Sequence, residues 1–70
     1  MKMSVTVDAG LSPKIENWLI GRDIDYEVEV VRTKKRTYLK IIARFPPDDR
    51  GNHQAELYGR FLERIRKGGA

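Results

Sequence analysis

The sequence predicts a small two-layer α+β domain with the element order β-α-β-β-α, and three patterns lead to that prediction. Residues 24–45 hold two runs of alternating apolar residues on either side of a basic segment, which is typical of a β-hairpin. A shorter alternating run over residues 3–7 indicates another strand. Two segments with apolar residues at helical spacing, starting near residues 12 and 49, add two helices. A chain of 70 residues is long enough for a single domain, which we place at residues 1–70.

The first helix has a recognisable beginning and end. Ser12 is a suitable N-cap, and Pro13 suits the first helical position because its missing N–H needs no partner there. The helix is expected to end near Gly21. Trp18 lies on its apolar stripe, so we expect it to be the largest residue of the core.

The hairpin has one favourable register, in which Lys34 meets Lys35 at the turn. This register forms four apolar pairs on one face: Val30–Leu39, Val28–Ile41, Tyr26–Ala43 and Ile24–Phe45. On the other face it sets Glu29 against Lys40 and Asp25 against Arg44, so opposite charges meet. A shift by one residue would turn every apolar side chain toward water.

The second helix follows Pro46-Pro47, which ends the hairpin because proline cannot donate to a strand ladder. Asp48 or Asp49 is expected to cap this helix, and Gly68 to end it. Gly59 lies at a margin of its apolar stripe, where glycine costs about 1 kcal/mol relative to alanine. We therefore expect a neighbouring backbone to come close at Gly59.

The third strand is apolar on both faces, with Tyr38 and Ile42 on the outer side, so it is expected at the centre of the sheet. The preferred strand order is 2-3-1. Both helices have one apolar stripe and should cover the same sheet face, leaving the other face open to water. A parallel pairing of the first and second strands remains the alternative.

Composition narrows the class of protein. The net charge is +4 and the isoelectric point is about 9.7, which favours an anionic partner. The lack of cysteine argues against a secreted disulfide scaffold. Neither a long apolar run nor a signal sequence is recognisable, so we expect a cytoplasmic protein without a membrane partner. A fold this small without disulfides or metal also makes a homodimer plausible.

The topology predicts that basic residues of the hairpin turn and of the last helical turn gather at one end of the molecule. A second helix of some seventeen residues rises about 26 Å, nearly the length of the hairpin, so its last turn should finish near the hairpin tip. We interpret the protein as a nucleic-acid-binding protein, with DNA favoured over RNA because the open sheet face offers Tyr38 as its only aromatic residue. The expected binding residues are Arg32, Lys34, Lys35, Arg36, Arg64 and Lys67.

A protein-interaction module is the alternative function. Val31, Tyr38 and Ile42 lie on the open face of the predicted sheet and could form a homodimer seam or contact another protein. An enzyme is not expected: His53 is the only histidine, Ser4 and Ser12 have structural explanations, and the glycines lack phosphate-loop spacing. The sequence predicts neither a cofactor, a metal nor a small-molecule substrate.

Overall fold

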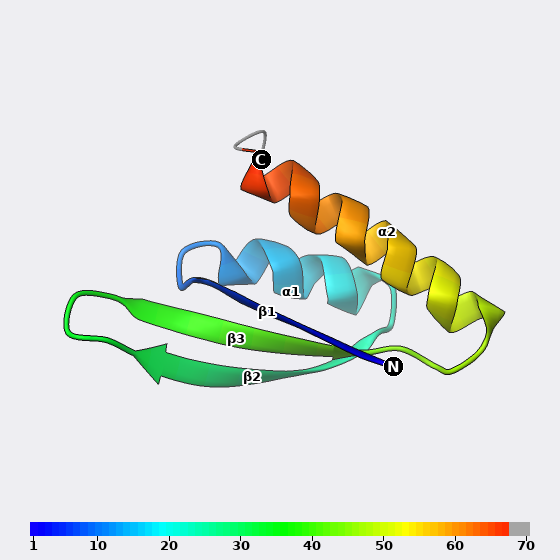
Figure 1. Cartoon of the computed structure of the whole chain (residues 1–70), viewed down its shortest axis with the longest axis horizontal. Coiled ribbons are helices and arrows are strands. Elements are labelled where there is room, and N and C mark those ends of the chain that lie inside the picture. Colours follow the sequence, from blue (N-terminus) through cyan, green and yellow to red (C-terminus); the bar gives the residue numbers. More distant parts are fainter. Residues whose placement is uncertain (68–70) are drawn as a thin grey trace.

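A computed structural model describes residues 1–67 of the chain (Figure 1). Its elements are β1 (Lys2–Asp8), α1 (Ser12–Gly21), β2 (Asp25–Arg32), β3 (Thr37–Arg44) and α2 (Asp49–Arg66). This order confirms the predicted β-α-β-β-α arrangement. The expected helix stop at Gly68 lies outside the described residues.

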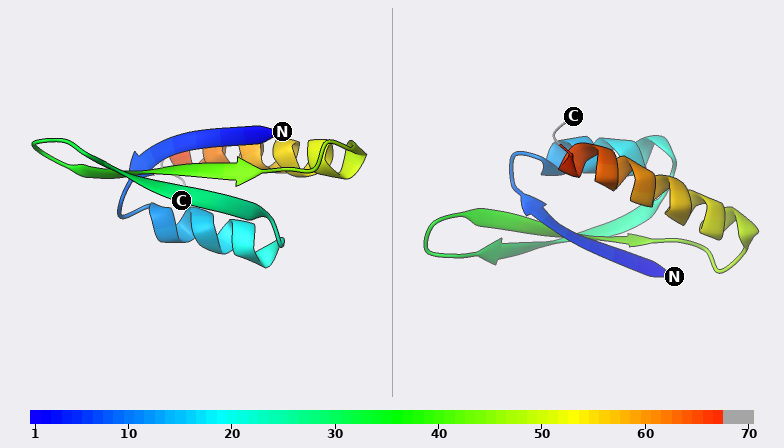
Figure 2. Two further views of the ribbon diagram at one scale, coloured as in Figure 1. Left: turned by 90° about the horizontal axis from the view of Figure 1, so that it is seen from below. Right: turned by 45° about the horizontal axis from the view of Figure 1, so that its top comes forward.

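The three strands form one antiparallel sheet in the order β1-β3-β2, which confirms the preferred strand order. The alternative parallel pairing of β1 with β2 is wrong, because β3 lies between them. Figure 2 shows both helices on one face of this sheet, with α1 on the side of β2 and α2 on the side of β1. None of residues 1–67 forms a layer over the opposite face of the sheet.

The hairpin register is the predicted one. Val30 is opposite Leu39, Val28 is opposite Ile41, and Tyr26 is opposite Ala43. The ladder ends at the pair of Asp25 with Arg44, so Ile24 and Phe45 lie just beyond it, both buried. The charge pairing differs. The Arg44 guanidinium pairs with the carboxylate of Glu27, diagonal to it, rather than with Asp25. Glu29 and Lys40 lie opposite each other, but no ion pair joins them in residues 1–67. Backbone register and side-chain pairing are thus set separately on this exposed face.

The two helices begin differently. Leu11, not Ser12, is the N-cap of α1, and it makes no side-chain capping bond. Ser12 is instead buried inside the first turn, where its hydroxyl donates to Glu16 Oε2 at 2.8 Å. In α2 the predicted cap is confirmed, since Asp48 Oδ1 accepts the Gly51 N–H at 2.8 Å. A side-chain cap is therefore present at α2 alone.

The close backbone approach predicted at Gly59 is found at Gly51 instead. A Cβ atom at Gly51 would lie 1.7 Å from the Pro46 carbonyl oxygen, whereas nothing lies within 4 Å of one at Gly59. The reason is local: Pro46 and Pro47 bring the chain back across the first turn of α2. The prediction for Gly59 is wrong because that side of the helix faces open space.

The core lies between the sheet and the two helices. Tyr58 of α2, not Trp18, is its largest fully buried side chain, and Trp18 is half-buried. The Tyr58 ring contacts both Phe45 and Trp18, with ring centroids 5.7 and 5.5 Å apart. The buried apolar residues are Ile15, Leu19, Ile24, Ile41, Ala43, Phe45, Ala55 and Tyr58.

The hairpin projects beyond the helical layer. In Figure 1 the turn between β2 and β3 extends past the beginning of α1 and past the end of α2. Val28 and Val30 therefore stay 38% and 59% exposed, although they are on the sheet face that the helices cover elsewhere. The apolar pairing of the hairpin is as predicted, but its outer part has no helix above it.

Candidate functional site

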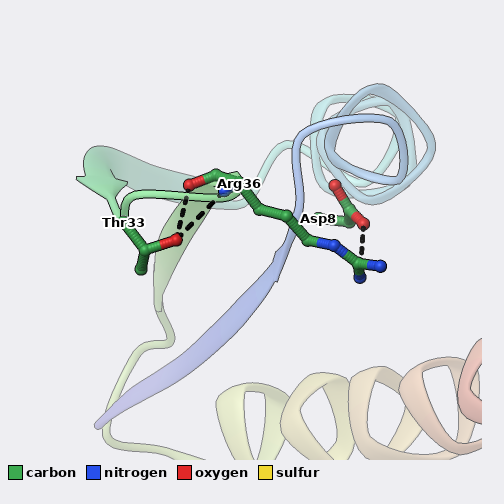
Figure 3. Close-up of polar contacts among 3 residues, drawn as sticks. All are labelled: Asp8, Thr33 and Arg36. Carbon is green, nitrogen blue, oxygen red and sulfur yellow. Dashed lines mark hydrogen bonds and ion pairs between the residues drawn. The ribbon is translucent and has the colours of Figure 1, made fainter.

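The turn at the hairpin tip is closed by Thr33 and Arg36. The Thr33 N–H donates to the Arg36 carbonyl at 2.9 Å. The Thr33 hydroxyl donates to the same carbonyl at 3.0 Å, and the Arg36 N–H donates to that hydroxyl at 3.1 Å (Figure 3). These bonds leave Lys34 and Lys35 at the apex of the turn, both exposed. Two lysines thus form the most projecting point of a turn with a defined backbone.

The arginines beside the turn have different surroundings. Arg36 points back to the end of β1, where a guanidinium nitrogen lies 3.8 Å from Asp8 Oδ2 (Figure 3). Both side chains are exposed, so this pair contributes little to stability. Arg32 is opposite Thr37 at the outer end of the ladder. Arg32, Lys34 and Lys35 form no ion pair in residues 1–67, so their charges are available to a ligand.

The end of α2 does not join the hairpin tip. The chain runs past the end of the sheet through Pro46–Asp48 before α2 begins, so this 18-residue helix finishes over the beginning of α1 (Figure 1). Arg64 lies in the last turn of α2, and Lys67 is the C-cap. The prediction that these residues meet the tip in one cluster is wrong. They belong to the helical layer, set back from the projecting hairpin.

A second basic cluster lies where α1 and α2 meet, and sequence reasoning missed two of its members. Arg22, Arg60 and Arg64 line a depression of about 190 Å³ together with Trp18, Leu57 and Phe61. The spacing of four residues between Trp18 and Arg22, and between Arg60 and Arg64, was the available signal, because such residues share a helix face. We call this group the helical arginine cluster.

Each arginine of the helical arginine cluster has different surroundings. Trp18 and Phe61 are stacked with ring centroids 5.1 Å apart and an interplanar angle of 14°. The Arg22 guanidinium carbon lies 4.0 Å from the Trp18 ring centroid, which is cation–π geometry. Arg60 pairs with Glu56 at 2.8 Å, as expected from their spacing. Arg64 forms neither an ion pair nor a cation–π contact in the described part of the chain.

Acidic residues gather at the end of the molecule away from the hairpin tip. Asp23, Asp25 and Asp48 line a depression of about 450 Å³, with Arg44 and Arg50 between them. No group of histidine, cysteine and carboxylate side chains in residues 1–67 is arranged to hold a metal ion. The cations of the tip and these carboxylates thus lie at opposite ends of the fold.

The predicted interface residues lie together on the open sheet face. Val31 is opposite Tyr38 across the hairpin, and Ile42 is further along β3 on the same face. Val31 is 38% exposed, while Tyr38 and Ile42 are half-buried by their neighbours. The sheet therefore presents a narrow apolar strip between charged residues.

Comparison with protein-family models, curated proteins and solved structures found no match to this chain. Within residues 1–67, none of the helices is both long enough and apolar enough to cross a lipid bilayer. The function of the protein is therefore inferred from the geometry and charge of the surfaces described above.

Proposed function

We propose that this protein binds nucleic acid, with duplex DNA preferred, through the tip of the β2–β3 hairpin. The supporting observation is the projection of that tip beyond the helical layer, with Arg32, Lys34, Lys35 and Arg36 all exposed on it. A two-stranded ribbon fits the major groove of B-DNA, which is about 12 Å wide. Lysine and arginine side chains that reach the phosphates displace condensed counterions, and this release drives binding.

The four tip residues have different roles in this proposal. Lys34 and Lys35 contact phosphates, because they are point charges at the apex of a turn whose backbone is fixed by Thr33. Arg32 is the residue that reaches a base edge, since its planar guanidinium has no acidic partner in the described residues. Arg36 is held toward Asp8 and supplies a weaker phosphate contact.

The end of α2 supplies a separate, flanking contact. Arg64 and Lys67 lie on the helical layer rather than at the tip, so they contact phosphates beside the groove that the hairpin enters. This contact adds affinity without sequence information, because the phosphate backbone is the same for every sequence.

The first prediction is that removal of the apex charges weakens DNA binding and its salt dependence. Lys34→Gln/Lys35→Gln should lower the affinity for a mixed duplex, and the slope of log affinity against log salt should fall by about 0.9 for each phosphate that the protein no longer neutralises. The matched control is Arg44→Gln/Arg50→Gln, which removes the same charge from the opposite end. Titration of a labelled duplex at several salt concentrations measures the affinity and its salt dependence. Single-stranded RNA is the comparison ligand.

If the two double variants lost affinity equally, the loss would be explained by net charge alone. That result would contradict a binding site at the tip. Absence of salt-dependent binding in the unmodified protein would contradict nucleic-acid binding altogether. In that case exposed Val31, with half-buried Tyr38 and Ile42 beside it, favours the second candidate function, a protein-interaction module on the open sheet face.

A further inference from the structure

The hydrogen-bond pattern of β1 shows which of its backbone groups are unpaired. Met1 and Phe45 exchange both backbone bonds, with the Met1 amino group donating at 3.0 Å and the Phe45 N–H at 2.8 Å. In an antiparallel pair such exchanging positions recur at every second residue. The Ala9 N–H, which donates to the Thr37 carbonyl at 3.3 Å, continues the same pattern at the other end. The odd-numbered residues of β1 therefore bond to β3.

The even-numbered residues of β1 point their N–H and C=O groups away from the sheet. These residues are Lys2, Ser4, Thr6 and Asp8. Among their backbone groups, the Asp8 carbonyl has a partner, because it accepts the Leu11 N–H at 2.9 Å. An edge strand of this kind is a template for pairing with another strand.

The β1 edge lacks the usual protection against such pairing. It runs for seven residues without a proline, and its charged residues, Lys2 and Asp8, are confined to the two ends. Figure 2 (left) shows β1 along one rim of the sheet, with α2 behind it rather than across its edge. The other edge, β2, carries Asp25, Glu27 and Glu29, which disfavour pairing.

We propose that a second copy of this chain pairs with the β1 edge, antiparallel and with the two-fold axis at Val5. In this register the even-numbered residues face one another as hydrogen-bonded pairs. Lys2 then lies opposite Asp8 of the second copy, and Ser4 lies opposite Thr6. Opposite charges meet at both ends of the seam, and hydroxyl side chains meet between them. All seven residues of β1 are paired, which no other two-fold register achieves.

The dimer would satisfy backbone groups and cover apolar surface. The two central pairs exchange two bonds each, and each outer pair keeps one because the Asp8 carbonyl is already in use, which gives roughly six new backbone bonds. A groove of about 320 Å³ runs beside β1 and includes Val5, Val7, Leu62 and Ile65. A second copy at the β1 edge lies against this groove. The interface is self-complementary and closes as a dimer.

The other edge does not offer an equivalent seam. A two-fold pairing of β2 about Val28 would set Glu27 against Glu29 of the second copy, so like charges would face one another. Pairing of β1 with β2 of another copy would be a head-to-tail contact, which leads to a ring or a filament and not to a two-fold dimer. The β1 seam thus pairs a whole edge strand and sets opposite charges against each other at both of its ends.

Such a dimer has one six-stranded sheet, with all helices on one face and the two hairpin tips at opposite ends. Each tip lies about six residues along β3 from the two-fold axis, or about 20 Å at 3.3 Å per residue. Along the strand direction the tips are then about 40 Å apart, somewhat more than one turn of duplex DNA, which is about 34–36 Å. The dimer itself does not depend on the proposed function, whereas this use of its spacing does.

The second prediction is that Thr6→Pro disrupts the dimer and leaves the monomer folded. The substitution removes an N–H that points away from β3, so the sheet of one chain keeps its bonds. We expect the unmodified protein to have a mass of about 16 kDa in solution, twice the 8.1 kDa of the chain, and Thr6→Pro to approach 8 kDa. Val30→Pro removes the equivalent outward N–H of β2 and should stay dimeric. Light scattering over a range of concentrations measures the mass, and circular dichroism checks the fold.

A charge exchange tests the register independently of any effect of proline on folding. Lys2→Asp places like charges at both ends of the seam and should weaken the dimer roughly ten-fold. Lys2→Asp/Asp8→Lys restores opposite charges and should recover most of that affinity. An unmodified protein that is monomeric at all concentrations, or a Thr6→Pro variant that remains dimeric, overturns the proposal. A Lys2→Asp dimer of unchanged affinity overturns the register. None of these three results depends on whether the hairpin tip binds DNA.

Discussion

Two glycines of α2 lie in opposite surroundings. Gly51 packs against the chain that precedes the helix, where a Cβ atom would meet the Pro46 carbonyl oxygen at 1.7 Å. Gly51→Ala should therefore cost about 1–3 kcal/mol, since the first turn of α2 must move. Gly59→Ala meets no atom and should stabilise the protein by up to about 1 kcal/mol, because alanine has the higher helix propensity. Urea unfolding of both variants measures the two changes, and effects of the same sign would contradict the packing described for Gly51.

The buried hydroxyl of Tyr58 makes stability depend on pH in the alkaline range. This hydroxyl has no hydrogen-bond partner in residues 1–67, and burial raises the pKa of Tyr58 from 10.0 to about 12. As the pH rises above 10, the unfolded chain loses the Tyr58 proton while the folded chain keeps it. The contribution of Tyr58 is constant below pH 10 and declines between pH 10 and 12, by at most about 1.4 kcal/mol per pH unit.

Comparison of Tyr58→Phe with the unmodified protein isolates this effect, because the two proteins differ in no other ionisable group. The variant should have a smaller decrease of unfolding free energy between pH 10 and 12. At pH 7 its stability should be equal or slightly higher, since a buried hydroxyl without a partner is removed. Parallel curves of unfolding free energy against pH would mean that water reaches the Tyr58 hydroxyl in the folded chain.

At the level of elements, one part of the hairpin is buried under the helices and the other part extends beyond them. Ile41 and Val30 share the sheet face that the helices cover, but Ile41 is fully buried and Val30 is 59% exposed. Ile41→Ala should cost about 2–5 kcal/mol, and Val30→Ala less than about 1 kcal/mol. Thermal unfolding monitored by circular dichroism compares them. A large cost at Val30 would indicate that another surface, such as a second copy, covers the outer hairpin in solution.

The same hairpin shows how far sequence reasoning reached. Alternation and cross-strand charge determine its register, so the pair of Val28 with Ile41 could be predicted from the chain alone. Exposure of Val28 could not, because it depends on where the helices end relative to the strands. The local pattern predicts Ser12 as the cap of α1, whereas Leu11 occupies that position in the fold. Sequence patterns within one element predict that element well. They predict less about how helices and strands are placed against one another.

Part of the candidate site can likewise be predicted from the sequence, and part depends on how the helices pack. Arg32, Lys34, Lys35 and Arg36 are neighbours in the sequence, so their grouping at the tip follows from the hairpin itself. The helical arginine cluster requires the rotation of α1 against α2, which brings Arg22 beside Arg64. That rotation is set by the packing of Trp18 against Phe61, a contact between residues far apart in the chain.

At the scale of the whole molecule, charge is distributed along the long axis. The fold measures 41 × 25 × 16 Å, with the basic tip at one end and the acidic depression lined by Asp23, Asp25 and Asp48 at the other. A net charge of +4 attracts the chain to a polyanion, and this separation orients it. In the proposed complex with nucleic acid, the tip is therefore the end that faces the phosphate backbone, and the carboxylates lie away from it.

The fluorescence of the single tryptophan can report which basic surface of the protein is occupied. Trp18 is the only residue of its kind in the chain, and it lies between Arg22 and Phe61 in the helical layer. Its fluorescence reports on the junction of α1 with α2, whereas the hairpin tip lies outside that layer. A nucleic acid held at the tip leaves the emission unchanged, and one held against the helical arginine cluster quenches it. One intrinsic signal thus distinguishes which of the two basic surfaces is occupied.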